Sequence, residues 1–554
     1  MPNSRHRAMS DPKPDIVVKT KSGNVVGSQC TSIYGDDYVS FERIPYAKPP
    51  LGSLRFKAPL PVDPWKKTLI CRQKGEKPLQ YNQYTKELQG VENCLYLNVY
   101  VKSMTTEKPL PLIVFFFGGG FEKGDPTRDL HSPDYFMMRD VVVVTVSYRV
   151  GPLGFLSLQD PAAGVPGNAG LKDQLLAMKW ITRNAACFNA DPANVTAFGE
   201  SAGAASVHYL MLNPAAEGLF QKAIMQSGNA LCSWAMCPVP NLARRLAESL
   251  GMKKLNQASD SKVLEYLQSV PGENLVKPYL LSEAENLDDC VFQFGPVVEP
   301  YSTESCVLPK QPLDLLDTAW GNNIPVLMSG TSFEGLLMYG RVHMSPYLLT
   351  SLKDQPEHLL PLELKRSLPQ EMAHHLGKRL KALHFGDKPL ELQQESVVAY
   401  CEYASYKVFW HPIMRTIKTR LQSSSAPTYL YRFDFDSSTF NHQRLKYCGD
   451  KLRGVAHIDD HSYIWYGDFA WKLDKHTAEF QTIERMIDIL TTFAATSNPN
   501  CASVESKLPK GTHWTPLAKK NIKCLNISDR IKIMELPEVN KLKVWDSIYK
   551  ANSK

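Results

Sequence analysis

The sequence contains no apolar run long enough to span a bilayer. Its longest apolar runs are residues 111–117 (PLIVFFF) and 141–146 (VVVVTV), whereas a transmembrane helix needs about 20 apolar residues. Runs of this length are typical of buried parallel strands. We therefore expect no transmembrane segment.

The N-terminus also lacks the apolar region of a secretory signal. Residues 1–15 (MPNSRHRAMSDPKPD) are polar and contain prolines, and residues 549–554 (YKANSK) match no retention or lipidation signal. We expect residues 1–14 to be a flexible segment. The expected location is cytoplasmic, with peripheral attachment to endomembranes or lipid droplets left open.

Neither charge nor cysteine content indicates a nucleic-acid or metal site. The chain has 63 Lys and Arg against 56 Asp and Glu, a formal net charge of +7 over 554 residues, and no dense basic block. Its 12 cysteines form no C-x-x-C pair. We expect no nucleic-acid partner, no metal, and mostly buried, reduced thiols.

The order of strand-like and helix-like segments indicates an α/β fold. Short β-like runs at 15–20, 23–28 and 94–101 come first, and apolar strands then alternate with segments of helical spacing. This alternation predicts a mostly parallel sheet with helices on both faces and a small N-terminal β region. Residues 15–550 show no repeat or long linker, so we expect a single domain. The segments expected after the first β runs are strands at 110–117, 141–149, 194–199 and 428–436, and helices at 167–188, within 340–425 and at 482–497.

A serine lies between two glycines in the sequence Gly199-Glu-Ser-Ala-Gly203. The strand-like VTAF precedes it and the helix-like AASVHYLML follows, as the strand-turn-helix of a nucleophile elbow requires. Small residues make room for the sharp turn, and the N-terminus of the helix favours developing negative charge. The alternative is an ordinary turn serine; the flanking strand and helix favour a nucleophile.

Three consecutive glycines, Gly118–Gly120, directly follow the predicted strand at 110–117. Glycines at this position let bare N–H groups approach a substrate oxygen, although a merely flexible loop would look the same. A nucleophilic serine also needs a histidine base and an orienting carboxylate, in the chain order Ser, acid, His. Eleven of the 14 histidines follow Glu334, so spacing alone does not choose the base.

Together these motifs resemble the type-B carboxylesterase/lipase family, which includes the cholinesterases, and the insect α-esterases in particular. The resemblance covers almost the whole chain and implies the α/β-hydrolase fold. The chain departs from the family pattern at three positions: Arg43 replaces a usual glycine, Asn93 a usual Asp, and Phe117 a common histidine. The segments that carry the resemblance are 41–59, 92–101, 167–181, 189–212, 220–230, 331–336 (TSFEGL), 454–460 (GVAHIDD), 492–500 and 513–516.

The resemblance implies a Ser-His-Glu triad. By position, Ser201 is the nucleophile, Glu334 the acid and His457 the base. His461, four residues after His457, is the alternative base. The implied mechanism passes through a covalent acyl-enzyme and needs no metal or organic cofactor.

The resemblance also implies the residues around the triad. Gly119, Gly120 and Ala202 are the expected oxyanion donors, and Trp234 is expected to line the acyl pocket, with an ordinary core tryptophan as the alternative. In the family, a cysteine pair corresponds to Cys71 and Cys94, which would stay open in a reducing compartment.

The resemblance implies a general carboxylesterase acting on small-molecule esters. Residues 66–93 contain no tryptophan to bind a quaternary ammonium group, which argues against choline esters. Glu200 stands where juvenile hormone esterases usually have glutamine. Apolar acyl, alkyl or aryl esters of xenobiotic or lipid origin remain, and organophosphates would phosphorylate the same serine. Alternatives are an organophosphate-sequestering protein or a non-catalytic binding member. A monomer or weak homo-oligomer is expected.

Overall fold

The computed structural model describes residues 15–551 except 84, 238, 288–291 and 521. The N-terminal segment 1–14, expected to be flexible, lies outside the described residues. Within the described ranges, none of the helices combines the length and apolar character that crossing a membrane requires.

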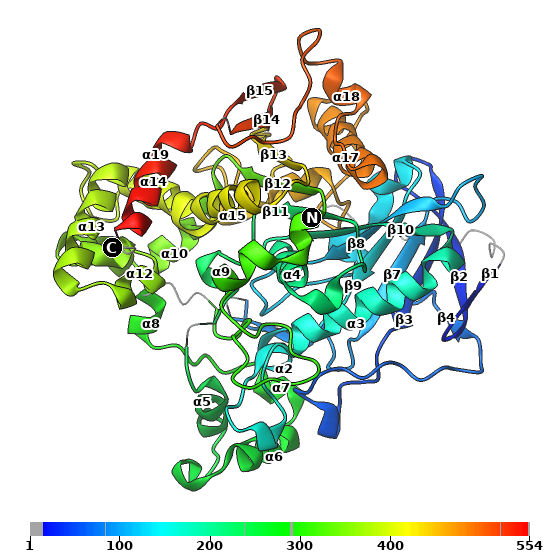
Figure 1. The fold of residues 1–554 in the computed structure, drawn as a ribbon, viewed down its shortest axis with the longest axis horizontal. Helices are drawn as coiled ribbons and strands as arrows, with labels where there is room; N and C mark the ends of the chain where they lie inside the picture. Colours follow the sequence, from blue (N-terminus) through cyan, green and yellow to red (C-terminus); the bar gives the residue numbers. More distant parts are fainter. Residues whose placement is uncertain (1–14, 84, 238, 288–291, 521, 552–554) are drawn as a thin grey trace.

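The described residues form a 13-stranded sheet in the order β1-β2-β3-β7-β9-β8-β10-β11-β12-β13-β14-β15, with β4 beside β2, and a separate hairpin of β5 and β6 (Figure 1). The strands are β1 (Ile16–Thr20), β2 (Gly23–Thr31), β3 (Asp37–Pro45), β4 (Leu69–Ile70), β5 (Gln80–Asn82), β6 (Glu87–Gln89), β7 (Tyr96–Val101), β8 (Leu110–Phe116), β9 (Val142–Val146), β10 (Ala190–Glu200), β11 (Lys222–Gln226), β12 (Val326–Thr331), β13 (Thr428–Phe433), β14 (Lys523–Ile527) and β15 (Lys532–Glu535).

The predicted sheet, mostly parallel with an N-terminal β region, is confirmed. Strands β9, β8 and β10 to β14 pair in parallel. Strands β1, β2, β3 and β7 pair antiparallel, as do β7 with β9 and β14 with β15. Antiparallel strands therefore extend both edges of the parallel core: β1, β2, β3 and β7 at one edge and β15 at the other.

Helices cover both faces of the sheet (Figure 1). Side chains alternate along β8: Leu112 and Val114 belong to the core that includes α3 and α4, whereas Ile113 and Phe115 belong to the core that includes α17. This two-residue period, with both faces apolar, explains why the strand is a continuous hydrophobic run.

The α-helices begin and end as follows: α1 (Arg128–His131), α2 (Gly151–Phe155), α3 (Ala169–Asn184), α4 (Ala202–Leu212), α5 (Leu242–Ser249), α6 (Asp260–Ser269), α7 (Gly272–Leu275), α8 (Glu283–Leu287), α9 (Pro312–Leu315), α10 (Tyr339–Met344), α11 (Tyr347–Thr350), α12 (Leu362–Ser367), α13 (Gln370–His384), α14 (Gln394–Ser405), α15 (His411–Ser423), α16 (His442–Cys448), α17 (Ala478–Thr496), α18 (Ala502–Glu505) and α19 (Val539–Lys550).

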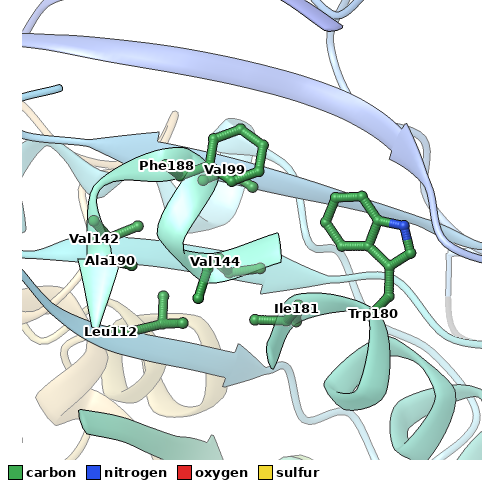
Figure 2. Close-up of a pocket in the computed structure, with 9 residues that line it drawn as sticks. Val99, Leu112, Val142, Val144, Trp180, Ile181, Phe188 and Ala190 are labelled. Carbon is green, nitrogen blue, oxygen red and sulfur yellow. The ribbon is translucent and has the colours of Figure 1, made fainter. Parts of the chain in front are cut away.

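An apolar cavity lies between the sheet and the end of α3 (Figure 2). Leu112, Val142 and Ala190 stand at or near the first residues of their strands, so the cavity is at the amino ends of β8, β9 and β10. The Trp180 indole N–H donates to Ser22 Oγ at 3.1 Å, and the other lining side chains are hydrocarbon, so the cavity offers no free polar group to orient a substrate. Its lining residues are Val99, Leu112, Val142, Val144, Trp180, Ile181, Ala185, Phe188 and Ala190.

The carboxyl ends of three strands bring the predicted site residues to one edge of the sheet. The glycine run follows β8, Ser201 follows β10, and Glu334 comes three residues after β12. Strands β8 and β10 are neighbours, and only β11 separates β10 from β12. In open parallel sheets, this edge is where ligands bind.

Candidate active site

Ser201 occupies a strained turn between β10 and α4. Its φ of 53° and ψ of −120° are unusual for a residue with a side chain. Its N–H donates to the carbonyl of Gln226 at 2.8 Å, which fixes the turn against β11.

The two glycines that flank Ser201 are required by close backbone contacts. A Cβ on Gly199 would lie 2.2 Å from the carbonyl carbon of Gly203. A Cβ on Gly203 would lie 1.9 Å from the carbonyl oxygen of Phe116. Because no side chain fits at either position, the G-x-S-x-G spacing follows directly from the geometry of the turn.

Ser201, His457 and Glu334 form a continuous hydrogen-bonded chain. His457 Nε2 is 3.0 Å from Ser201 Oγ, and His457 Nδ1 is 2.6 Å from Glu334 Oε2. Glu334 is 0% exposed and His457 is 7% exposed. This arrangement lets the imidazole accept the serine proton while the carboxylate stabilises the resulting cation.

The second carboxylate oxygen of Glu334 is also fully engaged. Oε1 accepts hydrogen bonds from Ser227 Oγ at 2.6 Å and from the N–H of Thr331 at 2.7 Å. These donors orient the carboxylate towards His457. Sequence reasoning missed Ser227, although the residue directly follows β11 and lies in the QSGNA segment that carried part of the resemblance.

The glycine loop presents backbone N–H groups near Ser201. The N–H of Gly118 donates to Oε1 of Glu200, the residue before the serine, at 2.6 Å. This N–H therefore already has a hydrogen-bond acceptor within the protein. Gly119 and Gly120 have φ values of 108° and 66°, which favour glycine. In the described part of the chain, no hydrogen bond from the N–H of Gly119, Gly120 or Ala202 to a protein acceptor is present.

Phe117, the departure from the family histidine, fixes the start of this loop. Its ring stacks on Tyr148 at a centroid distance of 4.3 Å with 12° between the planes. The Tyr148 hydroxyl donates to the Phe117 carbonyl at 2.6 Å. Tyr148 thus contacts Phe117 twice, through its ring and through its hydroxyl group.

An aromatic ring that sequence reasoning missed lies beside the base. The ring of Phe409 is 4.4 Å from that of His457 and tilted by 33°. Trp234 lies behind it, 6.1 Å from Phe409, and its Nε1–H donates to the Val408 carbonyl at 3.1 Å. Phe409 lies in a π-helical turn, Tyr406–Trp410, a form of helix found mostly at functional sites. The acyl-pocket role of Trp234 stays a prediction.

His461 has a different environment from His457. Its Nε2 pairs with Gln226 Oε1 at 3.2 Å, and burial holds its pKa well below the ordinary value. The 3₁₀-helix Asp459–Tyr463 begins after His457, so the two histidines do not share one helix. The structure thus pairs the serine with His457.

Buried carboxyl groups surround the site. Burial raises the pKa of Glu200 to about 7, partly offset by the nearby His457 and by the N–H of Gly118. Burial also raises the pKa of Asp459 to about 7 and that of Asp460 well above its usual range. The region behind the base is therefore poor in solvent, which strengthens electrostatic interactions at the reacting atoms.

Cys71 and Cys94 are free thiols in this structure. Burial raises the pKa of the Cys71 thiol to about 12. Among the described residues, no cluster of three or more His, Cys, Asp or Glu side chains is arranged to hold a metal ion.

Comparisons with known proteins agree on one family. Residues 14–545 match the carboxylesterase family. Esterase B1 of Culex pipiens is 37% identical over 544 residues, 96% of this chain and 98% of that protein. Juvenile hormone esterase of Tribolium castaneum is 32% identical over 87% of this chain and 84% of its own length. The crystal structure of juvenile hormone esterase from Manduca sexta, with OTFP covalently attached, superposes with a TM-score of 0.83 at 29% identity, covering 97% of this chain and all of that one.

Proposed function

The chain belongs to the carboxylesterase family and has its α/β-hydrolase fold, and from this premise we propose that Ser201, His457 and Glu334 are its catalytic triad. The chain is thus a carboxylic ester hydrolase. The observation that carries the triad assignment is the pair of contacts at His457, 3.0 Å to Ser201 Oγ and 2.6 Å to Glu334 Oε2.

The proposed reaction begins with acylation of the serine. Ser201 Oγ attacks the ester carbonyl carbon while His457 Nε2 accepts the hydroxyl proton, and the negative charge of Glu334 stabilises the imidazolium. The carbonyl π electrons move onto oxygen. That oxyanion accepts hydrogen bonds from the N–H groups of Gly119, Gly120 and Ala202, whose lack of protein acceptors in the described chain supports this role.

Collapse of the tetrahedral intermediate releases the alcohol. The bond between the acyl carbon and the alkoxy oxygen breaks, and His457 donates its proton to the leaving oxygen. Water then attacks the acyl-enzyme and gives one proton to His457. Cleavage of the acyl–Ser201 bond releases the acid, and His457 returns the proton to the serine oxygen.

The proposed substrates are esters with apolar acyl and alcohol groups. Phe409 beside His457 and Trp234 behind it supply hydrocarbon rather than directional contacts. One relative of this chain is named a juvenile hormone esterase. Such esterases usually have a glutamine where this chain has Glu200, so we propose that this chain accepts a broader range of esters.

We also propose that organophosphates phosphorylate Ser201. The Manduca sexta juvenile hormone esterase carries covalently attached OTFP, which supports the presence of a reactive group in a protein of the same fold. The bonded Ser201-His457-Glu334 chain favours turnover over the alternative of a non-catalytic binding or purely sequestering protein.

The test is hydrolysis of p-nitrophenyl esters by wild type and Ser201→Ala, with Ser53→Ala, an exposed serine, as the matched control. The Ser201 variant should fold and lose all but a trace of turnover, because a triad without its nucleophile fails as a unit. Labelling by an organophosphate should map to Ser201 alone. Retention of more than about 1% of wild-type turnover would remove Ser201 from the nucleophile role.

A further inference from the structure

A phenylalanine from a distant segment lies against the glycine loop. A Cβ on Gly120 would lie 2.2 Å from Cζ of Phe292, so the Phe292 ring occupies the space that a side chain at position 120 would need. This ring therefore packs against the loop that carries the predicted oxyanion donors Gly119 and Gly120, and it limits the space beside them.

Glu122 ties the segment that follows Phe292 to the same loop. Its Oε1 accepts hydrogen bonds from the N–H of Gln293 at 2.6 Å and from the N–H of Phe294 at 3.4 Å. The N–H of Glu122 itself donates to the Gly119 carbonyl at 3.3 Å. One loop thus supplies both the predicted oxyanion donors and the acceptor that holds the segment.

The other side of the segment is fixed to the region of Trp234. Cys237 Sγ donates to the Gln293 carbonyl at 3.0 Å, and the Cys237 N–H donates to the Pro296 carbonyl at 2.8 Å. Cys237 comes three residues after Trp234. The segment after Phe292 is therefore held from two sides, and Glu122 binds the two residues that directly follow Phe292.

Glu122 can change its charge near neutral pH. Burial raises its pKa to about 7, partly offset by the two backbone donors and by Lys123. Lys123 is the charged group on its own loop, and Tyr81 is the other titratable group along the cavity it faces. The remaining described lining of that cavity is uncharged: Leu79, Gln83, Gly151, Pro152, Val276, Gln293 and Phe294.

We propose that Glu122 is a positioning residue that holds Phe292 against the oxyanion loop, and that its ionisation sets the size of acyl group the site accepts. The proposal rests on the proposed function of Ser201. A carboxylate accepts N–H bonds roughly twice as strongly as a neutral group does. Ionised Glu122 therefore keeps Phe292 in place and favours short acyl chains, whereas protonated Glu122 lets the ring yield to long ones.

The experiment measures the ratio of kcat/KM for p-nitrophenyl acetate to that for p-nitrophenyl decanoate as a function of pH. A pH effect on the catalytic steps that both esters share cancels in the ratio. For the wild type, we expect the ratio to rise about fivefold between about pH 5.5 and about pH 8.5 as Glu122 ionises.

Three variants separate the contributions. Glu122→Gln keeps an acceptor oxygen without charge, so its ratio should stay at the acidic wild-type value at every pH. Phe292→Ala should give a low ratio, favouring the decanoate, that does not change with pH. Glu87→Gln, the same change at an exposed glutamate on β6, should behave as wild type.

A wild-type ratio that is flat with pH, or a titration that survives in Glu122→Gln, would overturn the proposal. So would an equal loss of activity towards both esters in Glu122→Gln with the wild-type pH response retained, because this would reduce Glu122 to a structural role. If Ser201→Ala keeps its activity, the proposed function fails whatever the ratio does, so the two failures are distinguishable.

Discussion

Glu334 and His457 are separated by 123 residues along the chain, yet Glu334 Oε2 lies 2.6 Å from His457 Nδ1. The contact forms because Glu334 follows β12 and its carboxylate is held by Ser227 and by the N–H of Thr331. The N–H of His457 also donates to the Glu334 carbonyl at 3.3 Å. A backbone contact and a side-chain contact therefore both fix the two loops relative to each other. The pair is therefore preorganised before any ester binds.

We predict that Glu334→Gln lowers kcat by about 10³–10⁴, because the neutral amide no longer stabilises the imidazolium and favours the wrong tautomer. Ser227→Ala should lower kcat by only about tenfold, since Glu334 keeps its charge and loses one of two donors to Oε1. Steady-state kinetics with p-nitrophenyl acetate measure both. Equal effects of the two changes would argue that orientation, rather than charge, is what Glu334 supplies.

A second prediction ranks the two histidines. His457→Ala should be as severe as Ser201→Ala, because deleting the base leaves the nucleophile inactive. His461→Ala should keep hydrolysis within about tenfold of wild type but lower the free energy of unfolding by about 2–4 kcal/mol, because it empties a buried site and leaves Gln226 Oε1 unpaired. Turnover and melting temperature are measured on both variants. The reverse ranking of turnover would move the base to His461.

A third prediction concerns the pH dependence of stability at Glu200. Its pKa of about 7 in the folded protein lies above its ordinary value, so folding favours the protonated form. The stability this contributes is complete below the ordinary pKa and is lost as pH rises through about 7. Glu200→Gln keeps an acceptor for the N–H of Gly118 but cannot ionise. We therefore expect the free energy of unfolding of Glu200→Gln, relative to that of the wild type, to increase by about 3 kcal/mol between about pH 4.5 and about pH 8.

The check is the difference in melting temperature between Glu200→Gln and wild type across that range. Other buried carboxyl groups, Asp459 among them, titrate in both proteins and cancel in the difference. Parallel curves for the two proteins would show that Glu200 ionises as easily in the folded protein as in the unfolded chain.

The sequence predicts the elbow well because its constraints are local. Gly199 and Gly203 nearly touch across the turn, so their spacing from Ser201 cannot vary. The sheet core is also predictable, since β8 is apolar on both faces. Arg43 stands where the family usually has glycine, and its φ of 64° explains that preference.

The residues that sequence reasoning missed depend on distant contacts. Phe409 meets His457 only because a π-helical turn, anchored by Trp234, brings it there, and no local pattern marks such a turn. Phe292 reaches Gly120 across more than 170 residues of chain. A distant contact also sets the start of one strand. Strand β10 begins at Ala190, before the expected residue 194, because Ala190 pairs with Leu110 of β8. The helix expected at 167–188 ends at Asn184 and continues as a 3₁₀ turn.

The last prediction compares Gly119 and Gly120 of the glycine loop, because a Cβ added at each position would meet a different neighbour. Gly120→Ala places a Cβ 2.2 Å from the Phe292 ring, at a φ of 66° that strains any side chain. The loop or the ring must shift, and a displaced oxyanion donor costs about a hundredfold in kcat. Adding Phe292→Leu removes the ring and should recover about tenfold of that loss, because the remaining cost is mainly the backbone strain of about 1–2 kcal/mol.

Gly119→Ala is the matched control, since its Cβ would lie 2.2 Å from the Lys123 carbonyl oxygen, which no side-chain truncation moves. Its loss of kcat should therefore be the same with and without Phe292→Leu. The measurement is a double-mutant cycle on kcat for each glycine with p-nitrophenyl acetate. Wild-type turnover in Gly120→Ala would remove this glycine from the oxyanion hole. Equal recovery at both positions would mean that Phe292→Leu raises activity generally, and the contact between Phe292 and Gly120 would then have no role in holding the donor.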